Sequence, residues 1–274
     1  MSYHPRNMQY KTVQNCEVTG DVRKLTQNLL DLDNPLLSTC DFGSVKWWNE
    51  RYLEHSQEFD FYVEYSDVQQ IIEKYCVKGR GRKSKSDESR ILVVGAGNSS
   101  MSHLLVDDGY ANIVNIDFSA AVVNRMKDKY FESSPNMTWQ TMNCTDLSFG
   151  DNTFNYALDK GTMDSVLCSD EPNKNSECYA LEMDRVLKDN DQSVWITISR
   201  GLPEEMLGYF ENDDTESSGF HTFDCVVHAI IKPNVYGEEN TFLKNCDDLY
   251  YVYVCRKNPQ KIKAKAAKRN RVTF

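Results

Sequence analysis

The sequence predicts an α/β fold in which helices cover both faces of a mostly parallel sheet. Three observations lead to this prediction. From residue 91 onward, short apolar runs of strand length alternate with helical segments, a pattern that builds right-handed βαβ units. A glycine-containing turn, Gly95-Ala96-Gly97, follows the first apolar run, and Asp117 ends the second. In a parallel sheet, both positions fall at the edge where ligands bind.

The N-terminal part of the sequence predicts an arm followed by two helices. Residues 1–40 show little periodicity, so we expect a flexible N-terminal arm. A helical lid is expected over 42–78, with one helix from about Ser44 and a second from Ser66, a residue type that favours the N-cap. Residues 78–90 are rich in Lys, Arg, Ser and Gly, which is typical of an exposed connection.

The later segments define the sheet. The predicted strands are 91–94, 113–116, 137–142, 154–158, 194–198, 223–230 and 249–255. Helices are predicted through Met101, after Ser119 and around 178–187. No clear helical pattern separates the last two strands, so we expect an antiparallel pair at the sheet edge. The catalytic or binding domain should span residues 41–256.

Composition excludes several classes of protein. The chain of 274 residues suits one large domain with extensions, and 40% apolar residues suffice for a core. No stretch approaches the roughly 18–20 apolar residues of a membrane span, and Met1–Lys11 has no signal-peptide core. The nine cysteines contain no C-x-x-C pair, which argues against a zinc site and a disulfide framework. We therefore expect a reducing compartment, the cytoplasm or the nucleus, and no metal.

Charge is distributed unevenly along the chain. The net charge is -10, but the residues from Arg256 onward include 8 basic and no acidic side chains. An acidic body favours basic partners and disfavours nucleic acid. The basic C-terminal tail, 257–274, is open to two interpretations, a polyanion-binding or nuclear-targeting segment and a solvated, frayed terminus. We expect a monomer that does not bind membranes.

The ends of the first two predicted strands suggest a nucleoside ligand. Gly95 and Gly97 allow a ligand to approach the backbone closely. Ser100 stands where the dinucleotide fingerprint has its third glycine, which disfavours NAD. Asp117 can accept both hydroxyls of a ribose, at about 1.5–3 kcal/mol for each charge-assisted bond; alternatively, it only starts the next helix. Phe118 is placed to lie against an adenine face.

The third and fourth predicted strands separate NAD from S-adenosylmethionine. Asn143-Cys144 ends the third strand, where an amide and a backbone N–H can bind the adenine edge. Asp159-Lys160-Gly161-Thr162-Met163-Asp164 ends the fourth, facing the methionine end of a bound S-adenosylmethionine.

At these motifs the chain resembles a known family. Residues 94–99, 114–117 and 159–164 are similar to the seven-β-strand methyltransferases related to the elongation factor 1-alpha lysine methyltransferases and methyltransferase-like 13. The last motif matches the family's D-K-G-T-L-D at five of six positions, and an aromatic motif over 45–52 and 59–62 also fits. The resemblance spans about 42–200. It implies a class I, Rossmann-like sheet of seven strands and S-adenosylmethionine as the cofactor.

The resemblance also implies the cofactor contacts. They are Trp48, Tyr52, Phe61, Gly95, Gly97, Asp117, Phe118, Asn143, Cys144 and Lys160. Phe61 stands where relatives commonly have Trp or Tyr, and Asn143 replaces a common acidic residue. The aromatic residues suit a lid over a sulfonium, because an aromatic face attracts a cation; alternatively, they form a helix that docks on the core.

The chemistry of methyl transfer requires mainly alignment and desolvation. A lysine acceptor must also lose a proton, which costs about 4.6 kcal/mol at pH 7 unless a dry site lowers its pKa. We predict no general base, and Asp159 and Asp164 are candidates only for orienting the acceptor. The leading hypothesis is methylation of a protein lysine, with elongation factor 1-alpha as the implied substrate. A small-molecule methyltransferase and a non-catalytic binding module are the alternatives.

Overall fold

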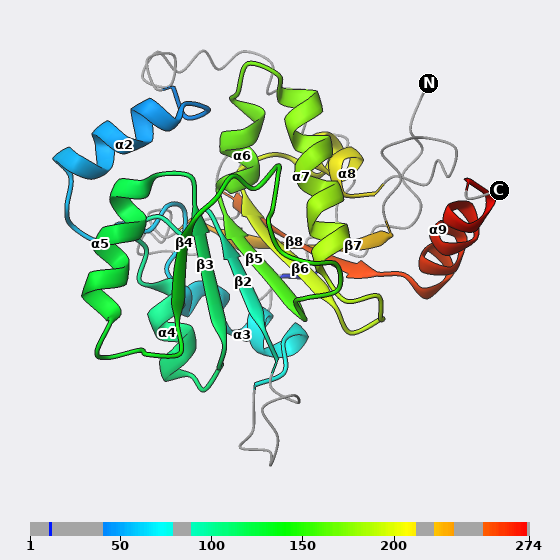
Figure 1. Cartoon of the computed structure of the whole chain (residues 1–274), viewed down its shortest axis with the longest axis horizontal. Helices are drawn as coiled ribbons and strands as arrows, with labels where there is room; N and C mark the ends of the chain where they lie inside the picture. Colours follow the sequence, from blue (N-terminus) through cyan, green and yellow to red (C-terminus); the bar gives the residue numbers. More distant parts are fainter. Residues whose placement is uncertain (1–10, 13–40, 79–88, 212–221, 233–248, 273–274) are drawn as a thin grey trace, which may run out of the picture.

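The centre of the molecule is one mixed β-sheet (Figure 1). The computed structural model describes residues 11–12, 41–78, 89–211, 222–232 and 249–272. The strands are β1 Lys11–Thr12, β2 Ile91–Val94, β3 Ile113–Asp117, β4 Thr138–Thr141, β5 Tyr156–Lys160, β6 Val194–Ser199, β7 Phe223–Ile231 and β8 Leu249–Lys257.

The strands lie in the order β1-β7-β8-β6-β5-β2-β3-β4. The pairs β2–β3, β3–β4, β2–β5 and β5–β6 are parallel, whereas β8 is antiparallel to both β6 and β7. The mostly parallel sheet and its antiparallel C-terminal pair are therefore confirmed. A two-residue strand, β1, pairs parallel with β7 inside the predicted N-terminal arm, whose other residues lie outside the described ranges.

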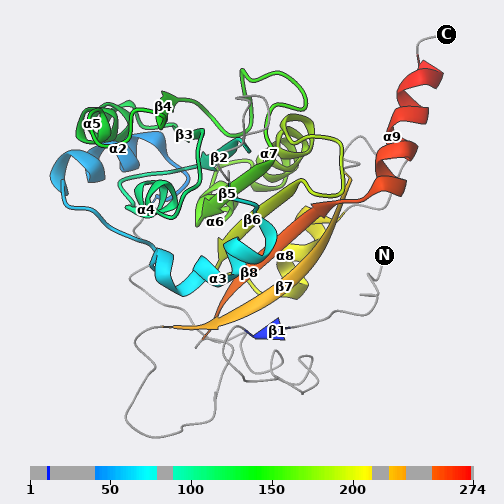
Figure 2. The ribbon, with the colours of Figure 1, turned by 90° about the horizontal axis from the view of Figure 1, so that it is seen from below.

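Helices cover both faces of the sheet, as predicted, and α9 lies beyond it (Figures 1 and 2). The helices are α2 Val45–Glu54, α3 Tyr65–Tyr75, α4 Met101–Asp107, α5 Ala120–Tyr130, α6 Thr162–Leu167, α7 Pro172–Val186, α8 Pro203–Phe210 and α9 Pro259–Val272. Buried residues of α2 to α5 form one hydrophobic cluster, and those of α6 to α8 form the other.

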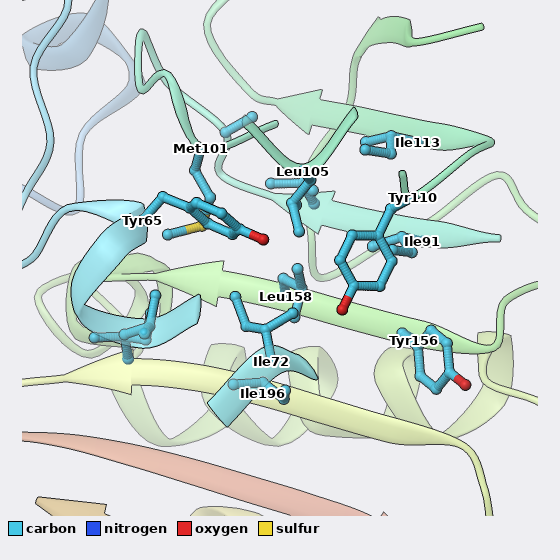
Figure 3. Packing of buried hydrophobic residues seen from close by; sticks show 14 of the residues in the cluster. Tyr65, Ile72, Ile91, Met101, Leu105, Tyr110, Ile113, Tyr156, Leu158 and Ile196 are labelled. Atoms are coloured by element: carbon cyan, nitrogen blue, oxygen red, sulfur yellow. The ribbon is translucent and has the colours of Figure 1, made fainter. Parts of the chain in front are cut away.

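The strand β2 shows why the predicted apolar runs are continuous. Ile91 and Val93 belong to the cluster of α2 to α5, whereas Leu92 and Val94 belong to the cluster of α6 to α8. A parallel strand with helices on both faces must be apolar on both. Figure 3 shows the first cluster, in which Ile72 of α3 lies among the strands near Leu158 and Ile196.

Serine caps account for two of the predicted helix starts. The Ser44 side chain accepts a hydrogen bond from Trp47 N, and the Ser119 side chain accepts one from Val122 N. The prediction of Ser66 as an N-cap was wrong, because α3 begins at Tyr65 and its N-cap lies two residues before Ser66. Its N-cap is Glu64, which forms a capping box with Asp67, so two carboxylates satisfy the free N–H groups.

The predicted boundary of the basic tail at residue 257 was also wrong. Lys257 is the last residue of β8 and is 1% exposed. Its ammonium lies 3.0 Å from an Asp184 carboxylate oxygen and 2.7 Å from Asp189. Lys261 and Lys265 of α9 pair with Asp224 and Asp184. Carboxylates of the body therefore fasten the start of α9 to the domain.

Two cysteines form a disulfide that the sequence did not indicate. Cys225 and Cys255 face each other across β7 and β8, with their Cα atoms 4.1 Å apart. They are 30 residues apart in the chain, so only the strand register brings them together.

None of the helices described combines the length and apolar character that a membrane span requires.

Candidate active site

A cavity of about 920 Å³ opens where the parallel strands β2, β3 and β5 end, the position at which such sheets bind ligands. All twelve residues that the sequence singled out line it. They are Trp48, Tyr52, Phe61, Gly95, Gly97, Asp117, Phe118, Asn143, Cys144, Asp159, Lys160 and Asp164. The fold therefore brings these residues together around one cavity, but the hydrogen bonds of each residue differ.

The turn after β2 requires glycine at two positions. Gly95 has φ 60° and Gly97 has φ 54°, in the left-handed region that side chains disfavour. A Cβ on Gly95 would lie 2.2 Å from Thr162 Oγ1, and one on Gly97 would lie 2.8 Å from the Tyr52 hydroxyl. The hydroxyl of Thr162 also donates to Val94 O at 2.9 Å. The backbone of the turn is thus in close contact with both α6 and α2.

Asp117 joins the end of β3 to this turn. Its Oδ2 accepts from Gly97 N at 3.0 Å and its Oδ1 accepts from Ser119 N at 2.9 Å. Burial raises the pKa of the carboxyl to about 6, although the two N–H groups oppose the shift. Each oxygen keeps a second lone pair, so the carboxylate can still accept hydrogen bonds from the two hydroxyls of a ribose. Ser119, not Asp117, caps the next helix.

Aromatic residues of the lid segment, which we define as residues 42–63, form one wall of the cavity. Trp48 stacks on Tyr52 with ring centroids 5.4 Å apart and meets Phe61 edge-on at 5.5 Å. The Trp48 indole N–H donates to Phe42 O at 2.8 Å. These rings pack on the core, as the second interpretation expects, and they also line the cavity.

A charged contact fastens the lid segment to the sheet. Asp60 forms an ion pair with Lys160, N to O 2.8 Å, and accepts hydrogen bonds from the hydroxyls of Ser99 and Ser100. The Lys160 ammonium also donates to Phe61 O at 3.0 Å. The Lys160 ammonium is thus bound to the lid segment, whereas the resemblance implied a contact between Lys160 and the cofactor. Sequence reasoning missed Asp60, although it stands within the quoted aromatic motif.

The hydrogen bonds of Asp159, a predicted candidate for orienting the acceptor, tie its carboxylate to the domain. Its Oδ2 accepts from the Tyr179 hydroxyl and the Trp195 indole, both at 2.9 Å, and its Oδ1 accepts from the Thr197 hydroxyl at 2.7 Å. Burial raises the pKa of this carboxyl to about 6. Three donors from α7 and β6 hold the carboxylate in the interior, so it joins a helix to the sheet.

Asp164 differs from Asp159 in having a free oxygen. Its Oδ1 accepts from the Ser199 hydroxyl at 2.9 Å and from Arg200 N at 3.3 Å. Its Oδ2 is buried and has no hydrogen-bond partner within the described ranges. Burial raises the pKa of this carboxyl.

Phe118, Asn143 and Cys144, which the sequence predicts to contact adenine, line the cavity. The side-chain carbonyl of Asn143 accepts a hydrogen bond from Thr145 N at 3.1 Å, which leaves the NH₂ group of Asn143 for a ligand.

Across the described part of the chain, no group of three or more His, Cys, Asp or Glu side chains is arranged to hold a metal ion.

Comparison with known proteins shows similarity to methyltransferases. Residues 91–190 match the family model described as a methyltransferase domain. The chain is 31% identical over 180 residues to the mouse protein named eEF1A lysine and N-terminal methyltransferase, covering 64% of this chain and 24% of that protein. It is 26% identical over 204 residues to mouse EEF1A lysine methyltransferase 4, covering 68% of this chain and 76% of that protein.

The chain spans about a quarter of the length of the first of these relatives. Among solved structures, the [4+2]-cyclase SpnF has a TM-score of 0.51 and 16% identity, covering 73% of this chain and 85% of that one. This likeness shows the fold.

Proposed function

We propose that the protein, whose residues 91–190 match a methyltransferase domain, is a class I methyltransferase that transfers the methyl group of S-adenosylmethionine to a lysine side chain of a protein. The proposed substrate is elongation factor 1-alpha, after which the relatives are named. A cytosolic location follows from such a substrate, and it is part of the same proposal.

The residues around the cavity fit the cofactor. We assign the ribose hydroxyls to Asp117, because its two oxygens lie beside a turn that only glycine can form. Phe118 and the free amide of Asn143 suit the adenine. The rings of Trp48 and Tyr52 suit the sulfonium, which carries the methyl group to be transferred.

The proposal of an amine acceptor rests on a second carboxylate that lines the same cavity, that of Asp164. Asp164 keeps one buried oxygen without a partner in the described ranges, and Glu205 also lines the cavity. An amine is the complement of such groups, because a buried carboxylate is costly unless it is paired. The protein would align the acceptor and exclude water, as this displacement requires.

Two alternatives remain distinguishable from this proposal. A small-molecule methyltransferase would use the same cofactor residues, so only the acceptor separates it. A binding module would have no need of the constrained contacts among Gly95, Gly97 and Asp117, which the chain retains.

The test is transfer of label from S-adenosylmethionine bearing a radioactive methyl group. The protein is incubated with cell lysate and, separately, with purified elongation factor 1-alpha, and the modified residue is located by mass spectrometry. Asp117→Ala serves as the matched variant, which should lose both cofactor affinity and labelling. Label on a lysine of the factor supports the proposal, whereas label only in the small-molecule fraction contradicts it. Absence of cofactor binding by calorimetry would favour the binding module.

A further inference from the structure

The cavity continues past the cofactor turn toward β6. In the sheet, β3 and β6 are separated by β2 and β5, so the part of the cavity beyond β5 is distinct from the part beside Asp117. Its lining includes Tyr62, Asp164, Arg200 and Tyr209. The predicted cofactor contacts leave this part unassigned.

Asp164 is held in one orientation at this end of the cavity. Its Oδ1 is fixed by the Ser199 hydroxyl and by Arg200 N, from the end of β6. This arrangement leaves Oδ2 buried, with no hydrogen-bond partner in the part of the chain that the structure describes. A native protein rarely leaves a buried carboxylate oxygen unpaired, so the geometry points to a donor that arrives with a ligand.

Tyr62 also lines this part of the cavity and has an unusual backbone conformation. Its φ is 69°, and Val63 N donates to Phe61 O at 2.8 Å across it, which is a tight γ-turn that a bulky residue rarely occupies. The Lys160 ammonium secures this turn through Phe61 O. The ring lies 4.9 Å from that of Tyr250 and approaches Gly161, where an added Cβ would be 3.3 Å away.

A strained position that surrounding contacts hold in place often belongs to a ligand site. Charges support this view, since the groups that act electrostatically on Tyr62 include both Asp164 and Arg200. Tyr62 and Asp164 both line the cavity, and the ring of Tyr62 lies close to Gly161, the N-cap of the helix α6 that carries Asp164.

We propose that Asp164 and Tyr62 form the acceptor subsite: Asp164 Oδ2 accepts a hydrogen bond from the acceptor nitrogen, and the ring of Tyr62 contacts the apolar stem that carries it. The ligand class is a primary amine at the end of an alkyl chain, as in a lysine side chain. This inference rests on the proposed function and names two residues for its acceptor. An N-terminal α-amine fits less well, because its adjacent peptide group would have to enter beside the ring without hydrogen-bond partners.

The experiment measures binding of small amines to the protein saturated with S-adenosylhomocysteine. The probes are n-butylamine, which has the stem and nitrogen of lysine, methylamine, which lacks the stem, and glycinamide, an α-amine next to an amide. Asp164→Asn keeps the size of the side chain, but its NH₂ group cannot accept a hydrogen bond. Tyr62→Asn removes the ring while tolerating the positive φ.

We expect wild type to bind n-butylamine more tightly than methylamine or glycinamide. Asp164→Asn should weaken n-butylamine at least tenfold while changing S-adenosylhomocysteine affinity less than twofold. Tyr62→Asn should remove most of the preference for n-butylamine over methylamine. With a confirmed substrate, Asp164→Asn should raise KM for the acceptor and leave KM for S-adenosylmethionine nearly unchanged.

Three results would overturn the proposal: no binding of n-butylamine to wild type, equal binding to wild type and Asp164→Asn, or a parallel loss of n-butylamine and S-adenosylhomocysteine affinity. The last would indicate a structural role for the carboxylate. Because these probes do not depend on elongation factor 1-alpha, a failure to label that factor leaves the result of this test intact.

Discussion

Asp60 of the lid segment and Lys160 at the end of β5 form an ion pair with an N to O distance of 2.8 Å, although they are 100 residues apart in the chain. Their side chains are only 15% and 6% exposed. Asp60 also accepts from Ser99 and Ser100 beside the glycine turn. One carboxylate therefore connects the lid segment, the glycine turn and the end of β5, so we expect the placement of the lid segment and the shape of the cofactor site to depend on each other.

Removing the Lys160 charge should weaken cofactor binding. Lys160→Met keeps the apolar stem but leaves Asp60 without its ammonium partner, a costly state for a largely buried carboxylate. We expect the Kd for S-adenosylmethionine to rise about tenfold, or about 1.4 kcal/mol, by calorimetry. The control is Lys174→Met, which breaks an exposed pair with Glu171 of the same 2.8 Å length and should change little. Equal Kd values for both variants and wild type would contradict the coupling.

Gly95→Ala should abolish the cofactor site by two effects. The new Cβ would be strained at φ 60° and would lie 2.2 Å from Thr162 Oγ1. Gly109→Ala separates these effects, since Gly109 has φ 93° but no atom within 4 Å of the added Cβ. We expect Gly109→Ala to lower the free energy of unfolding by about 1–2 kcal/mol without altering cofactor affinity. Gly95→Ala should reduce that affinity more than tenfold, and an affinity equal to that of Gly109→Ala would argue against the assigned turn.

Cofactor affinity should depend on the ionisation of Asp117. Burial raises the pKa of this carboxyl to about 6, against the opposing effect of two backbone N–H groups. Only the ionised form accepts at both oxygens, so affinity for S-adenosylmethionine should be constant above about pH 7 and fall as the pH drops through 6. Asp117→Asn should bind more weakly and show a flatter profile from pH 5 to 8. A wild-type affinity that is independent of pH over this range would refute the assignment.

Local sequence signals were sufficient where the structure depends on near neighbours. Ser44 and Ser119 cap helices by accepting from N–H groups three residues ahead. The ends of β2 and β3 were predictable because Gly95 follows the apolar run of β2 and Asp117 ends that of β3. Gly95, Gly97 and Asp117 consequently meet, as their positions at the ends of adjacent parallel strands require.

The parts that escaped prediction depend on the fold as a whole. Asp159 and Asp164 look equivalent in the motif, but strand alternation directs Asp159 into the layer of α7 and β6, whereas Asp164 stands on α6. The six residues of the motif do not indicate which helices cover each face of β5. The γ-turn at Tyr62 likewise depends on Lys160, 98 positions later in the sequence.

The contact that anchors α9 makes a prediction about stability. Burial alone would raise the pKa of Asp184, but the ammonium groups of Lys257 and Lys265 outweigh it and lower the pKa to about 2. A carboxyl with a depressed pKa stabilises the fold above its unfolded pKa of about 3.9 and loses that contribution as the pH falls toward 2. Asp184→Asn should lower the free energy of unfolding by about 3 kcal/mol near neutral pH, because it leaves the buried Lys257 with fewer partners.

The difference in the free energy of unfolding between wild type and Asp184→Asn should narrow by about 1 kcal/mol between pH 6 and pH 3, as measured by urea unfolding. Carboxyl groups that do not share Lys257 or Lys265 contribute equally in both proteins, so this double difference reports on the charge contacts of Asp184. Asp151→Asn is the control, since Asp151 is half exposed and its partner Arg185 keeps Glu182; it should cost less than about 1 kcal/mol at either pH. A gap between wild type and Asp184→Asn that stays constant with pH would mean that Asp184 stabilises the fold by packing and neutral hydrogen bonds, and that its charge does not fasten α9.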